Sequence, residues 1–224
     1  MITNTKNKFL KYLLTGTLIM LFSIPFKSAE AQDVSAGVDL YSTYVFRGVA
    51  FDGPSIQPYV EFSSGGFALG AWGSQGYNGF QEMDLYTAYS FDFGLSLGVT
   101  DYWYPTTSTA ASGPFFEGDS HAFELNVGYS IGDVSLAGNY IFAGEGSAGD
   151  DTYFEIGYAP GSVSLFAGAG DGWHSTDGDF ALVNLGVGTS KEIVVTESLT
   201  IPLSGAVIFN PDSENMYIVV GLSL

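Results

Sequence analysis

Cysteine is absent from this 224-residue chain, and basic residues are scarce. Without cysteine the protein has no disulfide framework, no thiolate metal site and no cysteine nucleophile. Six Lys and Arg residues stand against 24 Asp and Glu residues, which gives a formal net charge of −18. Such an acidic chain is a poor partner for nucleic acid or for anionic lipid surfaces, because both attract clusters of Lys and Arg.

A hydrophobic run long enough to span a bilayer as a helix is also missing. The apolar run at residues 13–22 is too short, since a spanning helix needs about 20 apolar residues. Three lysines at positions 6 to 11 precede it, and the tripeptide Ala-Glu-Ala at 29–31 follows. This order is typical of a secretory signal peptide. We therefore predict a cleaved signal peptide over residues 1–31 and one mature domain over residues 32–224.

The mature segment lacks the 3.6-residue apolar spacing of amphipathic helices. Apolar and polar residues alternate with period two instead, and clusters of Gly, Asn, Asp and Ser separate the alternating runs. We predict an all-β protein of twelve strands, with ten as the alternative count. The strands are expected near 36–49, 56–63, 67–74, 82–91, 94–103, 121–130, 134–142, 152–159, 163–170, 181–190, 199–209 and 216–224.

The connections between these strands alternate in length. Short turns such as Ser64-Gly65-Gly66 and Pro160-Gly161-Ser162 alternate with long loops rich in Gly, Ser and Asp, although the tenth connection, 191–198, is expected to be longer. An even number of strands with this alternation, behind a signal peptide, indicates an up-and-down antiparallel transmembrane β-barrel in the outer membrane of a Gram-negative bacterium. Closure of the barrel satisfies every strand edge, which lipid could not do.

A soluble secreted barrel or sandwich is the alternative, because its strands would alternate as well. In this chain, however, bulky apolar residues occupy one face of nearly every strand, and small or polar residues occupy the other. A soluble barrel packs its bulky residues inside. The scarcity of lysine is also unusual for a soluble surface, which mixes both charge signs. We therefore expect outer-membrane lipid to be a partner of the barrel.

Only two basic residues, Arg47 and Lys191, remain after residue 31. On the expected first strand Arg47 shares the polar face with Asp39, whereas Tyr44 and Phe46 fall on the lipid face. Arg47 is thus expected in the lumen, because a charge in lipid at mid-depth costs about 2–4 kcal/mol. The same parity gives the candidate lumen or constriction set: Arg47, Asp39, Glu61, Glu82, Asp84, Glu124 and Glu155.

Two roles are open for Arg47. A guanidinium can bridge carboxylates on neighbouring strands and so serve the structure. It can also oppose carboxylates across a pore constriction, since interior charges of barrels set selectivity.

Several blocks of the sequence together carry a family resemblance. They are Ser42-Thr43-Tyr44-Val45-Phe46-Arg47-Gly48-Val49, Gly53-Pro54-Ser55-Ile56-Gln57, Gly66-Phe67-Ala68-Leu69-Gly70-Ala71-Trp72-Gly73-Ser74, Glu82-x-Asp84-x-Tyr86, Thr100-Asp101-Tyr102-Trp103-Tyr104-Pro105 and the acidic residue Glu124. As a set they resemble the TorF porin family, also catalogued as the Gcw_chp family of uncharacterised bacterial outer-membrane proteins. The resemblance covers residues 40 to 129 and implies an outer-membrane barrel with diffusion-channel function.

Catalysis and metal binding have weaker signals. The chain has no Gly-x-Ser-x-Gly elbow, and a set of Ser120, His121 and Glu124 would need neighbours in sequence to meet, so we expect no enzyme. Both histidines, His121 and His174, are expected at the polar rim. The acidic segment 171–179 could offer oxygen ligands to Ca²⁺, but its spacing fits no EF-hand. We expect residues 102–104 to form an interfacial aromatic girdle, and we predict no cofactor or metal site.

The functional hypothesis is a porin-like barrel for passive diffusion of small solutes, with cations or neutral solutes preferred because the lumen is acidic. The alternative is a closed structural or adhesion barrel whose acidic outer loops bind partners or Ca²⁺. A twelve-stranded barrel is narrow enough for side chains to obstruct it, so the sequence leaves both open.

Overall fold

The computed structural model describes residues 32–105, 112–117, 120–144, 150–197 and 199–224. The predicted signal peptide, residues 1–31, lies outside the described residues, as do the loop acids Asp119 and Glu145. No helix among the described residues is long and apolar enough to cross a membrane.

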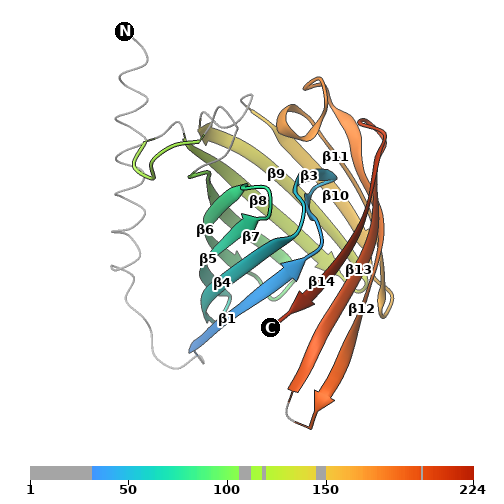
Figure 1. Cartoon of the computed structure of the whole chain (residues 1–224). Helices are drawn as coiled ribbons and strands as arrows, with labels where there is room; N and C mark the ends of the chain where they lie inside the picture. The colour runs from blue at the N-terminus through green and yellow to red at the C-terminus, as the bar shows by residue number, and fades with distance from the viewer. Residues whose placement is uncertain (1–31, 106–111, 118–119, 145–149, 198) are drawn as a thin grey trace.

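Twelve antiparallel strands close into a barrel, as the period-two pattern predicted (Figure 1). Each strand pairs with its neighbours in chain order, and β1 pairs with β14 to close the ring. The barrel strands are β1 (Gln32–Tyr41), β4 (Ser55–Ser64), β5 (Phe67–Gly76), β6 (Gln81–Ser90), β7 (Leu95–Trp103), β8 (His121–Ile131), β9 (Val134–Gly144), β10 (Thr152–Tyr158), β11 (Val163–Gly170), β12 (Ala181–Thr196), β13 (Leu199–Asn210) and β14 (Asn215–Ser223).

The predicted first strand is wrong in its second half. Strand β1 ends at Tyr41, and the chain then leaves the barrel wall to form a separate two-stranded sheet, β2 (Tyr44–Phe46) with β3 (Val49–Asp52). It returns to the wall at β4, whose Ser55 pairs with Tyr41 of β1. We call residues 44–52 the inner hairpin.

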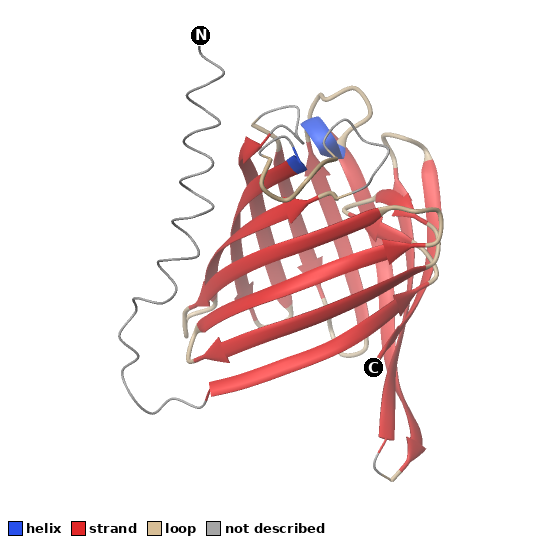
Figure 2. Cartoon of the chain, turned by 60° about the vertical axis from the view of Figure 1, so that its left-hand side comes forward, coloured by secondary structure: helices blue, strands red, loops and turns tan. Residues whose placement is uncertain are grey.

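The predicted long tenth connection is also wrong. Residues 191–196 continue β12, so that only residues 197 and 198 separate it from β13. The two strands stay paired from Leu185–Phe209 to Thr196–Leu199, with one irregularity near Val194. Figures 1 and 2 show that this hairpin projects beyond the rest of the barrel at the end with the short turns.

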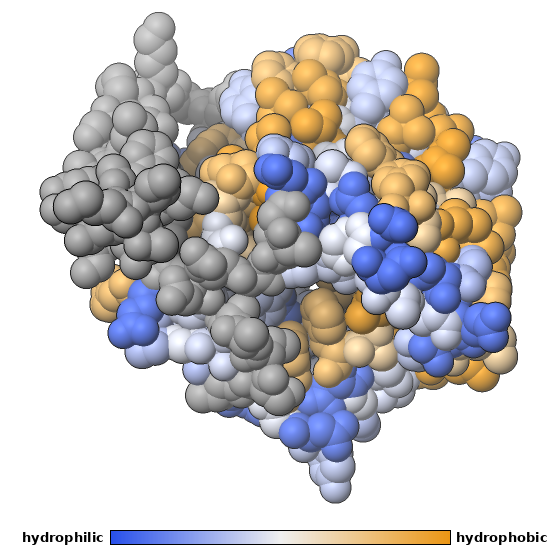
Figure 3. All heavy atoms as spheres, turned by 90° about the horizontal axis from the view of Figure 1, so that it is seen from above, coloured by the Kyte–Doolittle hydropathy of each residue, from blue (hydrophilic) through white to orange (hydrophobic). Residues whose placement is uncertain are grey.

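The outer face of the barrel is apolar. Alternate strand positions carry exposed large hydrophobic side chains, as at Leu125, Val127 and Tyr129 on β8 and at Met216 and Ile218 on β14. Their neighbours of opposite parity on β8, Glu124 and Asn126, point inward and are hydrogen-bonded to each other. In the view from the long-loop end, hydrophilic residues run through the middle and hydrophobic residues occupy much of the margin (Figure 3).

Glycine on the inner face makes room for aromatic rings. In four places an aromatic residue pairs directly with a glycine on the neighbouring strand, and a Cβ on that glycine would overlap the ring. Each ring therefore lies flat against the wall, where it covers the glycine backbone. The pairs are Tyr59 with Gly37, Tyr86 with Gly70, Phe166 with Gly186 and Tyr41 with Gly221.

Candidate lumen site

The tip of the inner hairpin is a two-residue turn. Phe46 pairs with Val49, and the two residues between them both have positive φ, 49° at Arg47 and 84° at Gly48. Positive φ at both central residues is the signature of a type I′ turn, which matches the twist of a hairpin. Arginine is costly in this conformation, so interactions of its side chain must hold it there.

Those interactions come from the barrel wall. Arg47 donates from both terminal nitrogens to the carboxylate of Glu124 on β8, at 2.6 and 2.9 Å. Its guanidinium also lies 4.7 Å from the ring centroid of Tyr153 on β10. The side chain of Glu124 is 1% exposed, and it accepts further hydrogen bonds from Tyr102 and Asn126. The buried charges are therefore paired in the bidentate geometry that offsets their desolvation best.

The opposite side of the tip rests on a distant part of the wall. Asn210 at the end of β13 donates to the carbonyl oxygen of Gly48 at 3.1 Å, and a Cβ on Gly48 would collide with the carbonyl oxygen of Val183 on β12. Strands β8 and β13 are five positions apart in the ring of twelve. The inner hairpin consequently extends across the lumen from one wall toward the other.

Aromatic rings fill the space around the hairpin toward the long-loop end. Tyr44, buried with its hydroxyl 2.8 Å from Glu82, contacts the ring of Phe51 on the second strand of the hairpin. Burial, followed by the negative charges of Glu82 and Asp84, raises the pKa of Tyr44, so its hydroxyl stays protonated and donates to Glu82.

The rings form one connected cluster, in which neighbouring ring centroids lie 5.0 to 6.2 Å apart. Its members are Tyr44, Phe46, Phe51, Trp72, Phe80, Tyr102, Tyr104 and Trp173.

A loop from the other side of the barrel contributes His174. It ends the 3-10 turn η2 (Gly172–His174) and is buried, with its ring 5.0 Å from that of Tyr153. Burial and the nearby positive charge of Arg47 lower the pKa of His174 to about 4. The imidazole is therefore neutral at pH 7 and adds no second positive charge near Arg47.

The base of the hairpin is fixed by Asp52. Its carboxylate accepts hydrogen bonds from the backbone N–H groups of Gly53, Asn78 and Phe80 and from the side chain of Asn78. Desolvation raises the pKa of Asp52, but these hydrogen bonds outweigh it and leave the pKa below its usual value. Asp52 thus ties the hairpin to the β5–β6 connection.

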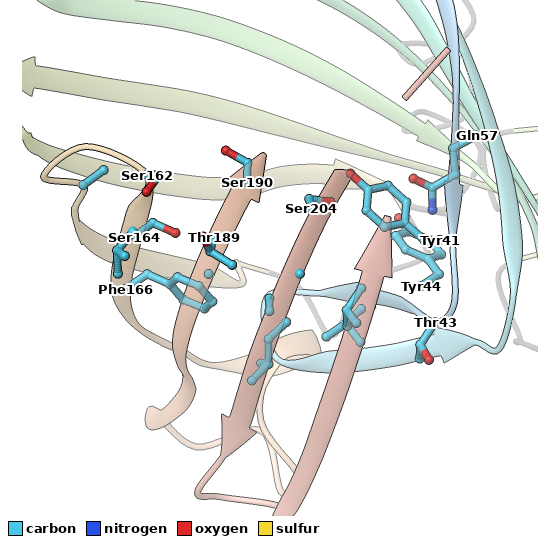
Figure 4. A pocket seen from close by; sticks show the side chains of 18 of the residues that line it. Tyr41, Thr43, Tyr44, Gln57, Ser162, Ser164, Phe166, Thr189, Ser190 and Ser204 are labelled. Atoms are coloured by element: carbon cyan, nitrogen blue, oxygen red, sulfur yellow. The ribbon is translucent and has the colours of Figure 1, made fainter. Parts of the chain in front are cut away.

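Beside the hairpin the lumen contains a cavity of about 570 Å³. Its walls come from β1, β4 and β11 to β14 and from the short turn after β10, and the hairpin residues Tyr44 and Val45 bound it (Figure 4). In the close view Tyr41 and Gln57 lie on one side, and the side chains of β11 and β12 lie on the other.

Comparison with known proteins places the chain in a family. The family described as "Bacterial protein of unknown function (Gcw_chp)" matches residues 27–193, most of the chain. The chain belongs to this family. The resemblance seen over residues 40 to 129 is confirmed, and the match extends well beyond it. None of the curated proteins matches the chain.

Solved structures similar to this Gcw_chp member include porins at low identity. A triple mutant of the porin of Rhodopseudomonas blastica has 17% identity and a TM-score of 0.43, with 88% of this chain and 74% of that chain covered. A structure described as "Asymmetric conductivity of engineered proteins" has 17% identity and a TM-score of 0.42, with 80% of this chain covered. The Gcw_chp chain spans 63% of the length of that protein.

Three of the candidate acidic residues surround the hairpin in this Gcw_chp protein. Glu124 binds Arg47, and Glu82 accepts from Tyr44. Asp84 is buried on the same face of β6, and its Oδ1 has no hydrogen-bond partner among the described residues.

The other three are not ion-paired with Arg47 in the described part of the chain. Glu155 on β10 accepts from Asn184 and from the hydroxyl of Tyr153, whose ring lies beside the Arg47 guanidinium. Glu61 on β4 accepts from Tyr86 at 2.9 Å, and Asp39 lies on β1 in register with Gln57.

Several sequence expectations near the long-loop end are wrong. Tyr44 and Phe46, expected in lipid, belong to the inner hairpin, and Tyr102 and Tyr104, expected in an aromatic girdle, are buried inside. Tyr44 and Phe46 lie inside the barrel because residues 42–54 leave the wall, so that these two side chains no longer belong to a wall strand.

The two histidines are not at a polar rim. His121 is fully buried, with its ring nitrogens 2.7 Å from Asp101 and 2.5 Å from the carbonyl oxygen of Phe115. Ser120 donates to two backbone carbonyls, so it does not reach His121 as a nucleophile would. Among the described residues, no three His, Asp or Glu side chains gather as a metal site would require.

Sequence reasoning missed the inner hairpin and the polar residues that receive it, Asn126, Tyr153 and Asn210. A local signal was present: the dipeptide Arg47-Gly48 lies between two short alternating runs, and such two-residue connections mark hairpins. The wall residues carried no such signal, because only the closed barrel brings β8, β10 and β13 to the tip.

Proposed function

We propose that this protein is a porin-like barrel for passive diffusion of small solutes, with the inner hairpin as its constriction. The observation that carries the proposal is the cavity inside the barrel, bounded by Tyr44 and Val45 of the hairpin. A lumen that holds open space beside one folded-in segment has the layout of a narrow channel whose width that segment sets.

The apolar outer face supports a place in the outer membrane of a Gram-negative bacterium. Most wall strands have 9 to 12 residues, close to the roughly 9–11 that a tilted strand needs to cross a bilayer. Exposed side chains such as Ile156 and Ile218 would be a liability in water and are favourable in lipid.

Charge inside the barrel supports a preference for cations or neutral solutes over anions. Arg47 is neutralised by Glu124, whereas Asp39, Glu61 and Glu155 have no cationic partner among the described residues. The remaining negative charge raises the free energy of an anion in the lumen.

A closed structural barrel is the second candidate. The tip of the hairpin is held by both Glu124 and Asn210, and aromatic rings fill the long-loop end around it. This packing favours a barrel that does not conduct and whose acidic loops contact partners outside the cell.

Single-channel conductance in planar bilayers tests the proposal. The wild type is compared with a variant in which residues 42–54 are replaced by Asn-Gly. Because Tyr41 and Ser55 are already paired between β1 and β4, a two-residue turn can join these strands directly. A change in conductance therefore reports removal of the hairpin rather than a rebuilt wall.

We expect small cation-selective steps in the wild type and larger ones in the excised variant. Steps of equal size in both would show that the hairpin is not the constriction. A wild-type barrel that folds but stays silent, while the excised variant conducts, would favour the closed structural barrel. Silence of both folded barrels would overturn the channel proposal.

A further inference from the structure

The cavity beside the inner hairpin is lined without a single formal charge. Its lining is uncharged at every position, although the chain as a whole carries 24 acidic residues. Five of the lining side chains bear hydroxyl groups on the inner face of the wall or on the turn that joins β10 to β11: Tyr41, Ser162, Ser164, Ser190 and Ser204. Figure 4 shows these side chains around the cavity.

The hydroxyl groups on the inner faces of β11 and β12 are available to a ligand. Within the part of the chain that the structure describes, no protein group is hydrogen-bonded to the side-chain oxygens of Ser164 or Ser190. Each hydroxyl can both donate and accept, so it matches the hydroxyl groups of a solute in either role.

Two aromatic rings add flat apolar surfaces to the same cavity. The ring of Phe166 lies against Gly186, and the ring of Tyr41 lies against Gly221 with Ser204 beside it. Since a glycine backs each ring, one face rests on the wall and the other is free to meet the C–H face of a ligand. A sugar or polyol has an apolar C–H face and several hydroxyl groups, so it can contact the rings and the hydroxyl groups of the cavity at the same time.

Ionic solutes meet no opposite charge on the lining of this cavity. The neighbouring acid Asp39, in register with the lining residue Gln57, raises the free energy of an anion there. A neutral hydroxyl, by contrast, exchanges one hydrogen bond for another when it enters.

We infer that this cavity is a binding site for uncharged, hydroxyl-rich solutes of about monosaccharide size. Its volume of about 570 Å³ lies within the range of small-ligand pockets, roughly 300–1,000 Å³. The inference rests on the proposed channel function and specifies its substrate class, so the test separates binding from passage.

The test uses three probes that share the pyranose ring: glucose, protonated glucosamine and glucuronate, at pH 7. Binding is measured by saturation-transfer NMR on the refolded barrel in a zwitterionic detergent, because a sugar detergent would compete. Passage is measured by swelling of liposomes that contain the barrel. We expect glucose to give the strongest transfer signal and the fastest swelling.

One substitution and a matched control locate the site. Ser164→Asp introduces a carboxylate into the lining, and we expect it to weaken the glucose signal by about three- to tenfold. Ser130→Asp makes the same change on the face of β8 that carries Glu124, outside the cavity lining, and should leave the signal unchanged.

The outcomes are distinct. A glucose signal that Ser164→Asp removes and Ser130→Asp keeps supports the site, even if liposomes do not swell and the channel function fails. Swelling at equal rates for all three probes, with no preferential glucose signal, overturns the site and leaves the channel intact. Equal effects of the two substitutions also overturn it, because the cavity would then not be where glucose binds.

Discussion

Arg47 and Glu124 lie 77 residues apart and meet inside the barrel through two hydrogen bonds of 2.6 and 2.9 Å. One comes from the tip of the inner hairpin and the other from the barrel wall. The pair therefore joins the inner hairpin to the barrel wall, and its loss should destabilise both parts.

Glu124→Gln should destabilise the barrel by about 3–5 kcal/mol, the cost of leaving one member of a buried ion pair without its partner. Unfolding by urea in lipid vesicles, followed by tryptophan fluorescence, measures the change. Glu61→Gln is the control: among the described residues Glu61 accepts one side-chain hydrogen bond, from Tyr86, so this variant should lose about 1 kcal/mol. Equal losses of unfolding free energy in the two variants would mean that the Arg47–Glu124 ion pair stabilises the barrel no more than the hydrogen bond from Tyr86 to Glu61.

Gly48→Ala should destabilise the protein more than Gly79→Ala. Both glycines have positive φ, 84° and 101°, so both substitutions strain the backbone by about 1 kcal/mol. A Cβ at position 48 would also collide with the carbonyl oxygen of Val183, whereas a Cβ at position 79 meets nothing within 4 Å. The difference between the two urea midpoints measures the contact of the tip with the wall. Identical midpoints would indicate that the tip does not rest on β12.

His174 should make the stability depend on pH between about 6.5 and 4. Its pKa is about 4 in the folded protein and near 6.5 in the unfolded chain, so the unfolded state binds the proton first. Stability is then full above pH 6.5 and falls as the pH drops through this window, by about 3 kcal/mol at most. Below pH 4 both states are protonated, and the contribution of His174 no longer changes.

The variant His174→Gln isolates this contribution from those of the carboxylates. Urea unfolding of both proteins at pH 7, 6, 5 and 4 should give a shallower fall in the variant. Parallel curves would show that His174 is already solvated or charged in the folded barrel.

Gly186→Ala should narrow the cavity without unfolding the barrel. The added Cβ would occupy the place of the Phe166 ring, which then has to turn away from the wall. Single-channel conductance should fall. Gly138→Ala is the control, because its Cβ would meet the ring of Phe154 at an ordinary 3.5 Å. A fall of equal size in both variants would show that the conductance does not depend on the position of the Phe166 ring.

The wall strands could be predicted from the sequence because the two faces of each strand meet different surroundings along its whole length. A wall strand has one face outside the barrel and one toward the lumen, so bulky apolar residues alternate with small or polar ones, as at Leu125, Asn126 and Val127. Eleven of the twelve predicted strands coincide with observed strands within a few residues, apart from the extension of β12 to Thr196. The signal peptide stays a prediction.

The first strand failed for the same reason that the others succeeded. Residues 44–46 and 49–52 alternate as a wall strand does, because a hairpin packed between aromatic rings and polar groups also has two unlike faces. Period two distinguishes a strand from a helix, but it does not say which surface each face meets.

By itself, the amino-acid sequence determined the class of the strands and their number, since local alternation requires no knowledge of distant residues. Only the tertiary structure decided which charges meet. Closure brings β8, β10 and β13 to the tip of the hairpin, and so pairs Arg47 with Glu124 and leaves the cavity uncharged. These contacts join residues far apart in the chain, and the ring of twelve strands sets their positions.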